Sequence, residues 1–106
     1  MRQKRIDLAN EIFSIYRINL EAGIQVTPEF VNAYATSSRN LADAKIDNLN
    51  EYGLEECDIE KEHRDRLLDL KRHISDDFDN QRSLLDELID FYLLDSEIKL
   101  NVLQCK

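Results

Sequence analysis

Residues 23–29 read Gly-Ile-Gln-Val-Thr-Pro-Glu, and this stretch decides the fold because it ends one helix and starts the next. Glycine often terminates helices, since it adopts the left-handed backbone conformation without strain. Thr27 is a good N-cap, Pro28 suits the first helical position, and Glu29 lies near the positive end of the helix dipole. The stretch therefore predicts a turn between two neighbouring helices.

The segments on both sides of this turn have apolar residues at helical spacing. The first helix is predicted over residues 4–22 and the second from Thr27 to about Tyr52, where Gly53 would cap it. The inward stripe of the first helix consists of Ile6, Ala9, Phe13, Tyr16 and Leu20, widened by Ile12 and Ile15. Small inward residues in the second helix, such as Ala35 and Ser38, permit a close helix approach.

The rest of the chain is also helical in pattern, but it needs an interruption. A third helix is predicted from an N-cap at Asp58, and a single helix from there to the C-terminus would be about 70 Å long. The polar tract at residues 75–80 is rich in Ser, Asp and Asn, which compete for backbone hydrogen bonds. We expect a kink or turn there, followed by a last helix over about residues 80–104.

The length of 106 residues suits one helical domain over residues 1–106. The predicted fold is all-α, either an antiparallel four-helix bundle or three helices with a long, bent C-terminal helix. Segment 80–104 is apolar around more than half of its circumference, more than one neighbouring helix can cover. Two explanations stay open at this stage. The chain forms a homodimer through segments 4–22 and 80–104, or the last helix lies at the centre of the monomer.

The formal net charge of −8 makes direct binding to nucleic acid or to an anionic membrane surface unfavourable, and it favours a protein partner with a basic surface. The N-terminal residues lack the apolar core of a signal peptide, and no long apolar run is present, so we expect a cytoplasmic protein. Cys57 and Cys105 lie far apart without a metal-binding or redox motif, and we interpret them as reduced thiols.

One local pattern points to metal chemistry. In Glu60-Lys61-Glu62-His63, Glu60 and His63 lie three residues apart, so a helix projects both to one side. The string loosely resembles one in encapsulated ferritin-like proteins, which are small helical dimers, and the resemblance implies a metal-binding oligomer. A di-iron bundle needs a second Glu-x-x-His unit, which this chain lacks. We therefore interpret His63 as a structural histidine at the edge of the core, with the metal site as an alternative.

No glycine-rich elbow or phosphate-binding loop accompanies the serines, cysteines and two histidines, so we expect neither an enzyme nor a cofactor. The leading hypothesis is a small acidic interaction module, such as an inhibitor, adaptor or small chaperone, whose acidic face could mimic the charge of a nucleic acid. The candidate partner-binding residues are acidic: Asp76, Asp77, Asp79, Asp86, Glu87 and Asp90. A purely structural bundle is the remaining alternative.

Overall fold

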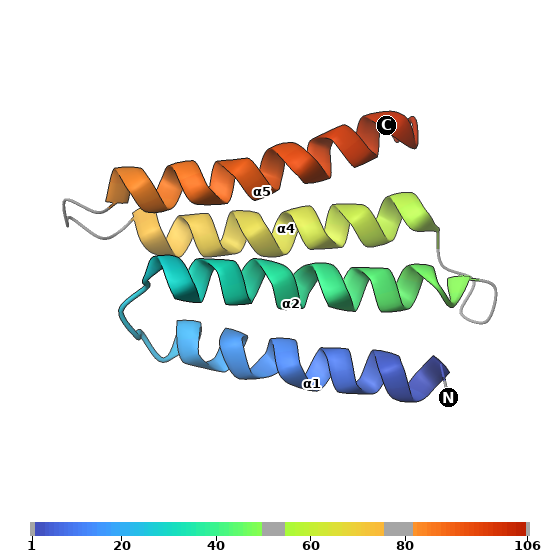
Figure 1. Cartoon of the computed structure of the whole chain (residues 1–106), viewed down its shortest axis with the longest axis horizontal. Helices are drawn as coiled ribbons and strands as arrows, with labels where there is room; N and C mark the ends of the chain where they lie inside the picture. Colours follow the sequence, from blue (N-terminus) through green and yellow to red (C-terminus); the bar gives the residue numbers. More distant parts are fainter. Residues whose placement is uncertain (1, 50–54, 76–81, 106) are drawn as a thin grey trace.

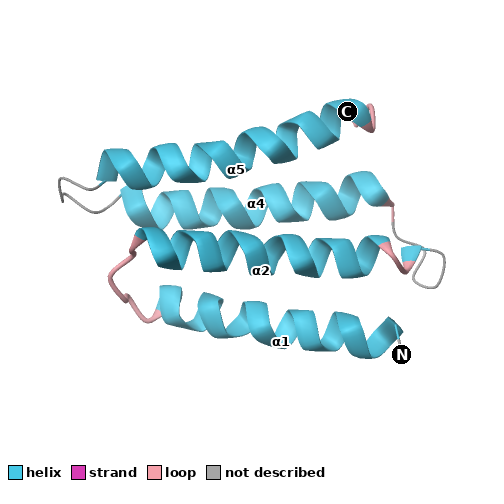
Figure 2. Ribbon diagram, viewed as in Figure 1, coloured by secondary structure: helices cyan, strands magenta, loops and turns pink. Residues whose placement is uncertain are grey.

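The computed structural model describes residues 2–49, 55–75 and 82–105. These residues form four helices, which are α1 (Arg2–Glu21), α2 (Pro28–Ile46), α4 (Glu56–Ser75) and α5 (Arg82–Val102) (Figure 1). Figure 2 shows that the described connections between them are loops and turns. The prediction of an all-α four-helix bundle is confirmed, and the alternative of a long, bent third helix is wrong.

The helices lie side by side in chain order, and each runs opposite to the one before it (Figure 1). Helix α1 packs on α2, α2 on α4, and α4 on α5, while α5 also reaches α2. The Cα atoms span 45 × 29 × 16 Å, so the bundle is flattened. The central positions belong to α2 and α4, and the expectation of a central last helix is wrong. Because α1 and α5 are the outer helices, each has one face without a neighbour.

The turn between α1 and α2 is built as the sequence predicts. Gly23 has a φ of 83°, and its N–H donates to the carbonyl of Leu20 at 3.1 Å. Thr27 is the N-cap of α2, and its hydroxyl accepts the N–H of Phe30 at 3.1 Å, with Pro28 at the first helical position. These bonds satisfy backbone groups that have no partner inside a helix.

Helix α2 ends at Ile46, earlier than the predicted end at Tyr52. The buried amide of Asn48 donates to the carbonyl of Ala44 at 2.9 Å, and the backbone N–H of Asn48 bonds to Lys45 at 3.0 Å. Such side-chain bonds compete with the helical ladder and end it. The predicted cap at residue 53 lies outside the described residues.

The start of α4 and the gap between α4 and α5 test two further predictions from the sequence. Helix α4 begins at Glu56, so Asp58 lies in its first turn and the prediction of Asp58 as N-cap is wrong. An acidic side chain there still favours the helix through the dipole. Helix α4 ends at Ser75 and α5 begins at Arg82, so two separate helices flank the polar tract, as the sequence predicts.

The core is one cluster to which all four helices contribute. Its buried members are Phe13, Leu20, Val31, Tyr34, Ala35, Leu41, Leu67, Leu70, Ile74, Leu85, Ile89 and Leu93. Ile12 and Ile15, predicted to widen the buried stripe of the first helix, are exposed instead. Helix α1 packs along one side only, so the width of its apolar stripe exceeds what α2 covers.

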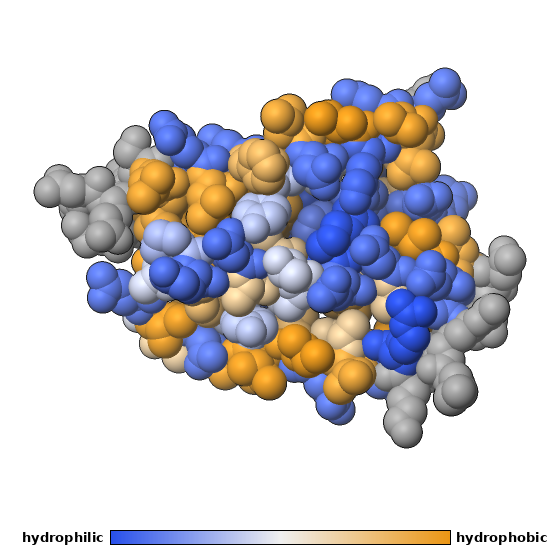
Figure 3. Space-filling view, in the orientation of Figure 1, coloured by the Kyte–Doolittle hydropathy of each residue, from blue (hydrophilic) through white to orange (hydrophobic). Residues whose placement is uncertain are grey.

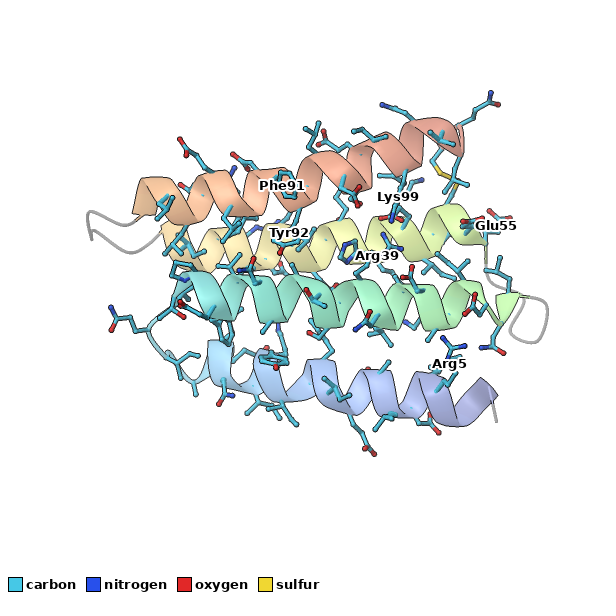
Figure 4. All side chains as sticks on the ribbon, in the orientation of Figure 1. Arg5, Arg39, Glu55, Phe91, Tyr92 and Lys99 are labelled. Carbon is cyan, nitrogen blue, oxygen red and sulfur yellow. A yellow bond between two sulfur atoms is a disulfide. The ribbon has the colours of Figure 1, made fainter. Side chains whose placement is uncertain are left out.

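The two cysteines form a disulfide, which overturns the expectation of reduced thiols. Cys57 in the first turn of α4 is bonded to Cys105, just beyond α5, across 48 positions of sequence (Figure 4). The two cysteines are far apart in the sequence, so their spacing did not predict the bond. The antiparallel packing of α4 on α5 brings the start of α4 close to the end of α5. The bond ties the C-terminal end of α5 to its neighbour.

Candidate functional site

The carboxylate of Glu60 is the centre of a buried polar network in the middle of the bundle. Glu60 is 1% exposed, and one guanidinium nitrogen of Arg39 on α2 donates to both of its oxygens, at 2.7 and 2.9 Å. The hydroxyl of Ser96 on α5 donates to the same carboxylate at 2.7 Å. Arg39 also pairs with Asp43 at 3.0 Å, and it lies between α2 and α4 in Figure 4. Glu60 thereby links α4 to both of its neighbours.

His63 lies one turn further along α4, where it is part of a neighbouring buried polar group with Ser38 and Arg66. It is 3% exposed, and its Nδ1 is 2.7 Å from the hydroxyl of Ser38 on α2. Arg66 Nε donates to the same hydroxyl at 2.6 Å, and a second nitrogen of Arg66 donates to the Ser38 carbonyl at 3.1 Å. Ser38 Oγ accepts from Arg66 and also bonds to Nδ1 of His63, with the donor in this second bond set by the tautomer of the imidazole.

The electrostatic environment keeps His63 neutral. Burial, together with the nearby positive charges of Arg39, Arg66 and Lys99, lowers the pKa of His63 to about 3 from its ordinary value of 6.5. A cationic imidazole would lose its hydration and face three other cations. His63 therefore stays uncharged in the fold across the physiological pH range.

A second polar cluster ties α1 to the centre of the bundle. Arg17 on α1 donates to the hydroxyl of the buried Tyr34 at 3.2 Å and to Asp69 on α4 at 3.4 Å. Burial raises the pKa of the Tyr34 phenol, which therefore stays protonated. The guanidinium of Arg66 also lies over the ring of Phe13, 5.4 Å from its centroid. Polar contacts thus orient α1 as well as α5.

The predicted metal ligands are brought together, but their described atoms have protein partners. Both oxygens of Glu60 accept from Arg39, and Nδ1 of His63 faces Ser38. Within the described ranges, no group of three His, Cys, Asp or Glu side chains lies close enough to hold a metal ion. Three hollows on the described surface, of about 290–380 Å³ each, are lined by residues other than Glu60 and His63. The arrangement fits a structural network that fixes how three helices meet.

Both outer helices expose large apolar side chains, and the outer face of α5 carries the longer row. Five large apolar side chains there are each between 52% and 77% exposed, and they are Leu84, Phe91, Leu94, Ile98 and Val102. We call them the α5 stripe. They recur at helical spacing on the side of α5 opposite to the buried Leu85, Ile89, Leu93 and Leu100. Figure 3 shows apolar surface gathered along the edge of the molecule formed by α5, and more along the α1 edge.

The predicted acidic face is only partly described. Asp76, Asp77 and Asp79 lie outside the described residues. Asp86 is half-buried, whereas Glu87 and Asp90 are exposed, and Asp90 pairs with Lys71 of α4. The structure thus places Glu87 within the width of the α5 stripe and Asp90 at its margin, whereas Asp86 faces the bundle.

No family model, curated protein or solved structure matches this chain. The interpretation of the site therefore rests on the geometry and chemistry of the chain itself. In the described helices, no segment has the length and apolar content needed to cross a membrane.

Sequence reasoning missed most of the partners in the buried network. Arg39 and Arg66 gave no signal, because isolated arginines on charged helices are usually solvated. The sequence did give a signal at Ser96, since this residue falls between Leu93 and Leu100 on the buried heptad positions of α5. A polar residue at such a position needs a buried partner, which is Glu60 here.

Proposed function

We propose that this protein is a non-enzymatic interaction module that binds another protein through the outer face of α5. The observation that carries the proposal is the α5 stripe, defined above, which exposes five large apolar side chains on one helix face. Single exposed apolar residues are normal, whereas a contiguous row of them marks a binding surface in soluble proteins.

The interior supports the same proposal. Glu60 and His63, the residues best suited to acid–base or metal chemistry, are buried and bonded to neighbouring side chains. Their arrangement supports a role in holding α2, α4 and α5 in register, which would present α5 as a rigid surface. The narrower hypothesis of a nucleic-acid mimic depends largely on Asp76, Asp77 and Asp79, which lie outside the described residues.

The predicted cytoplasmic location is not supported by the disulfide. Cytosolic proteins usually keep their thiols reduced, and disulfides persist in oxidising compartments. The pairing of Cys57 with Cys105 instead favours an oxidising compartment as the place where the module acts.

Site-specific photo-cross-linking in the source cells tests the proposal. A photoreactive phenylalanine analogue at position 91, in the α5 stripe, should give an adduct with one other protein. The same analogue at position 15, an exposed position on α1, should not give that adduct. The purified partner should then bind the wild-type chain and lose affinity for Phe91→Ser. Cross-links at position 91 only to a second copy of this chain, or none at all, would overturn the proposal.

A further inference from the structure

The α5 stripe runs along one face of the helix for most of its length, and Phe91, Leu94 and Ile98 follow the spacing of a helix-packing seam. Its members follow one another at steps of seven, three, four and four residues. From Leu84 to Val102 the stripe extends about 27 Å, at 1.5 Å per residue. A seam of this kind accepts a partner helix, whose apolar side chains pack between those of Phe91, Leu94 and Ile98.

Acidic side chains border this stripe. Glu87 lies within its width, Asp90 and Glu97 follow one margin, and Asp95 lies on the other, and all four are exposed. Lys71 and Lys99 pair with Asp90 and Asp95, and Lys61 and Arg64 of α4 line the same hollow as Glu97. The charged side chains that α5 itself places beside the stripe are nevertheless mainly acidic. In helix pairs, the residues that border the apolar seam decide which partner is accepted.

The charge of these margins distinguishes between the two simplest occupants. A second copy of α5 would bring Glu87, Asp90 and Glu97 of one chain close to carboxylates of the other, and like charges repel across such an interface. A helix with lysine or arginine beside its own apolar stripe would instead place cations against these carboxylates. An anionic membrane surface is disfavoured for the same reason as the second copy.

We infer that the α5 stripe binds a basic amphipathic helix of a partner protein, about 18 residues long. This inference rests on the proposed function and names the chemistry of the partner. The apolar faces supply the contact area, while Glu87 and Glu97 select a basic partner and orient it. Fit to an α-helix follows from the unbroken course of α5 from Arg82 to Val102, which offers one continuous helix face.

A synthetic peptide tests this inference directly. The probe is an acetylated, amidated and fluorescein-labelled peptide of about 18 residues, with leucine along one helix face and lysine or arginine beside it. Fluorescence anisotropy should show that the disulfide-bonded chain binds this peptide at least tenfold more tightly than a scrambled peptide of the same composition, whose apolar residues share no face. A peptide with glutamate in place of every basic residue should bind more weakly still.

Three variants of exposed residues separate the two contributions without disturbing the core. Phe91→Ser should weaken binding of the basic peptide by about tenfold or more, because aromatic residues dominate such interfaces. The matched control Ile15→Ser, on the opposite edge of the bundle, should change the Kd less than twofold. The double variant Glu87→Gln/Glu97→Gln should weaken binding several-fold and reduce its dependence on salt.

Specific results would overturn the inference. These are equal affinity for the basic and the scrambled peptide, equal affinity of the wild-type chain and Phe91→Ser, or tighter binding of the acidic peptide. A dimer in light scattering that Phe91→Ser dissociates would assign the stripe to a second copy. If the peptide fails while position 91 still cross-links to a partner protein, the proposed function stands and only the basic helix is wrong.

Discussion

At the scale of single residues, the protein depends on charged and polar groups placed in its interior. Arg39, Glu60 and Ser96 come from three different helices and meet through hydrogen bonds of 2.7–2.9 Å. A buried ion pair is not by itself strongly stabilising, because both charges lose their hydration. Its value lies in the cost of separating the partners, and this cost disfavours other packings of the same helices.

Glu60→Gln should therefore lower the free energy of unfolding by about 3 kcal/mol or more, because it leaves the guanidinium of Arg39 without its buried counter-charge. Urea denaturation followed by circular dichroism measures this. The matched control is Glu62→Gln on the same helix, which removes an exposed pair with Lys45 and should cost less than about 1 kcal/mol. Equal effects of the two substitutions would contradict a special role for the buried carboxylate.

The neutral state of His63 makes stability depend on pH. The folded protein takes up this proton only near pH 3, whereas the unfolded chain takes it up at the ordinary pKa of 6.5. Protonation therefore favours unfolding. The contribution of neutral His63 to the free energy of unfolding is fully present above pH 6.5 and is lost as the pH falls toward 3. At pH 5 the free energy of unfolding should be about 2 kcal/mol lower than at neutral pH for this reason.

NMR titration measures this directly, and the ring protons of His63 should not shift between pH 7.5 and pH 5. In urea denaturation over the same range, His63→Gln should reduce the pH dependence of the free energy of unfolding. A midpoint for His63 near pH 6.5 would show that its ring is not buried among cations.

At the scale of elements, local sequence signals placed the helices well where the backbone itself needs a particular residue. Gly23 adopts a positive φ, Thr27 caps α2 with its side chain, and the interruption between α4 and α5 falls at the polar tract. The signals failed where a local side-chain bond competes with the helical ladder. The side chain of Asn48 bonds back to the carbonyl of Ala44, and α2 ends earlier than the glycine at position 53 predicts.

The cap at Thr27 provides a test at this scale. Thr27→Ala should lower the free energy of unfolding by about 1 kcal/mol, because the N–H of Phe30 loses its acceptor. Thermal or urea denaturation measures the change. Thr36→Ala, at an exposed position within α2, should be neutral or slightly stabilising, since alanine is the better helix former. A loss at position 36 equal to that at position 27 would argue against the cap.

At the scale of the whole molecule, the flattened arrangement of helices decides which apolar surface is buried. Helices α2 and α4 lie between neighbours and bury Val31, Tyr34, Leu67 and Leu70 completely. Helix α5 lies at an edge and is held there by the buried network and by the disulfide at its C-terminal end. The edge position leaves the α5 stripe available for a partner.

Loss of the disulfide should destabilise the whole bundle. The bond closes a loop across 48 positions, and removing such a constraint typically costs about 2–4 kcal/mol. Urea denaturation with and without dithiothreitol measures the difference, and the reductant should have no effect on the control Cys57→Ser/Cys105→Ser. Alkylation of two thiols in denatured protein that was never reduced would show that the bond does not form.

The sequence by itself determined the helical class, the turn at residues 23–29, the break after Ser75 and most of the buried stripes. These features depend on backbone preferences and on a periodicity that operates within a few residues. Only the tertiary structure decided that Cys57 pairs with Cys105, that Glu60 bonds to Arg39 and Ser96, and that α5 lies at an edge. The physical reason is that these outcomes join residues far apart in the chain. A helix with apolar residues on several faces can be central or peripheral, and packing against its neighbours decides which face meets solvent.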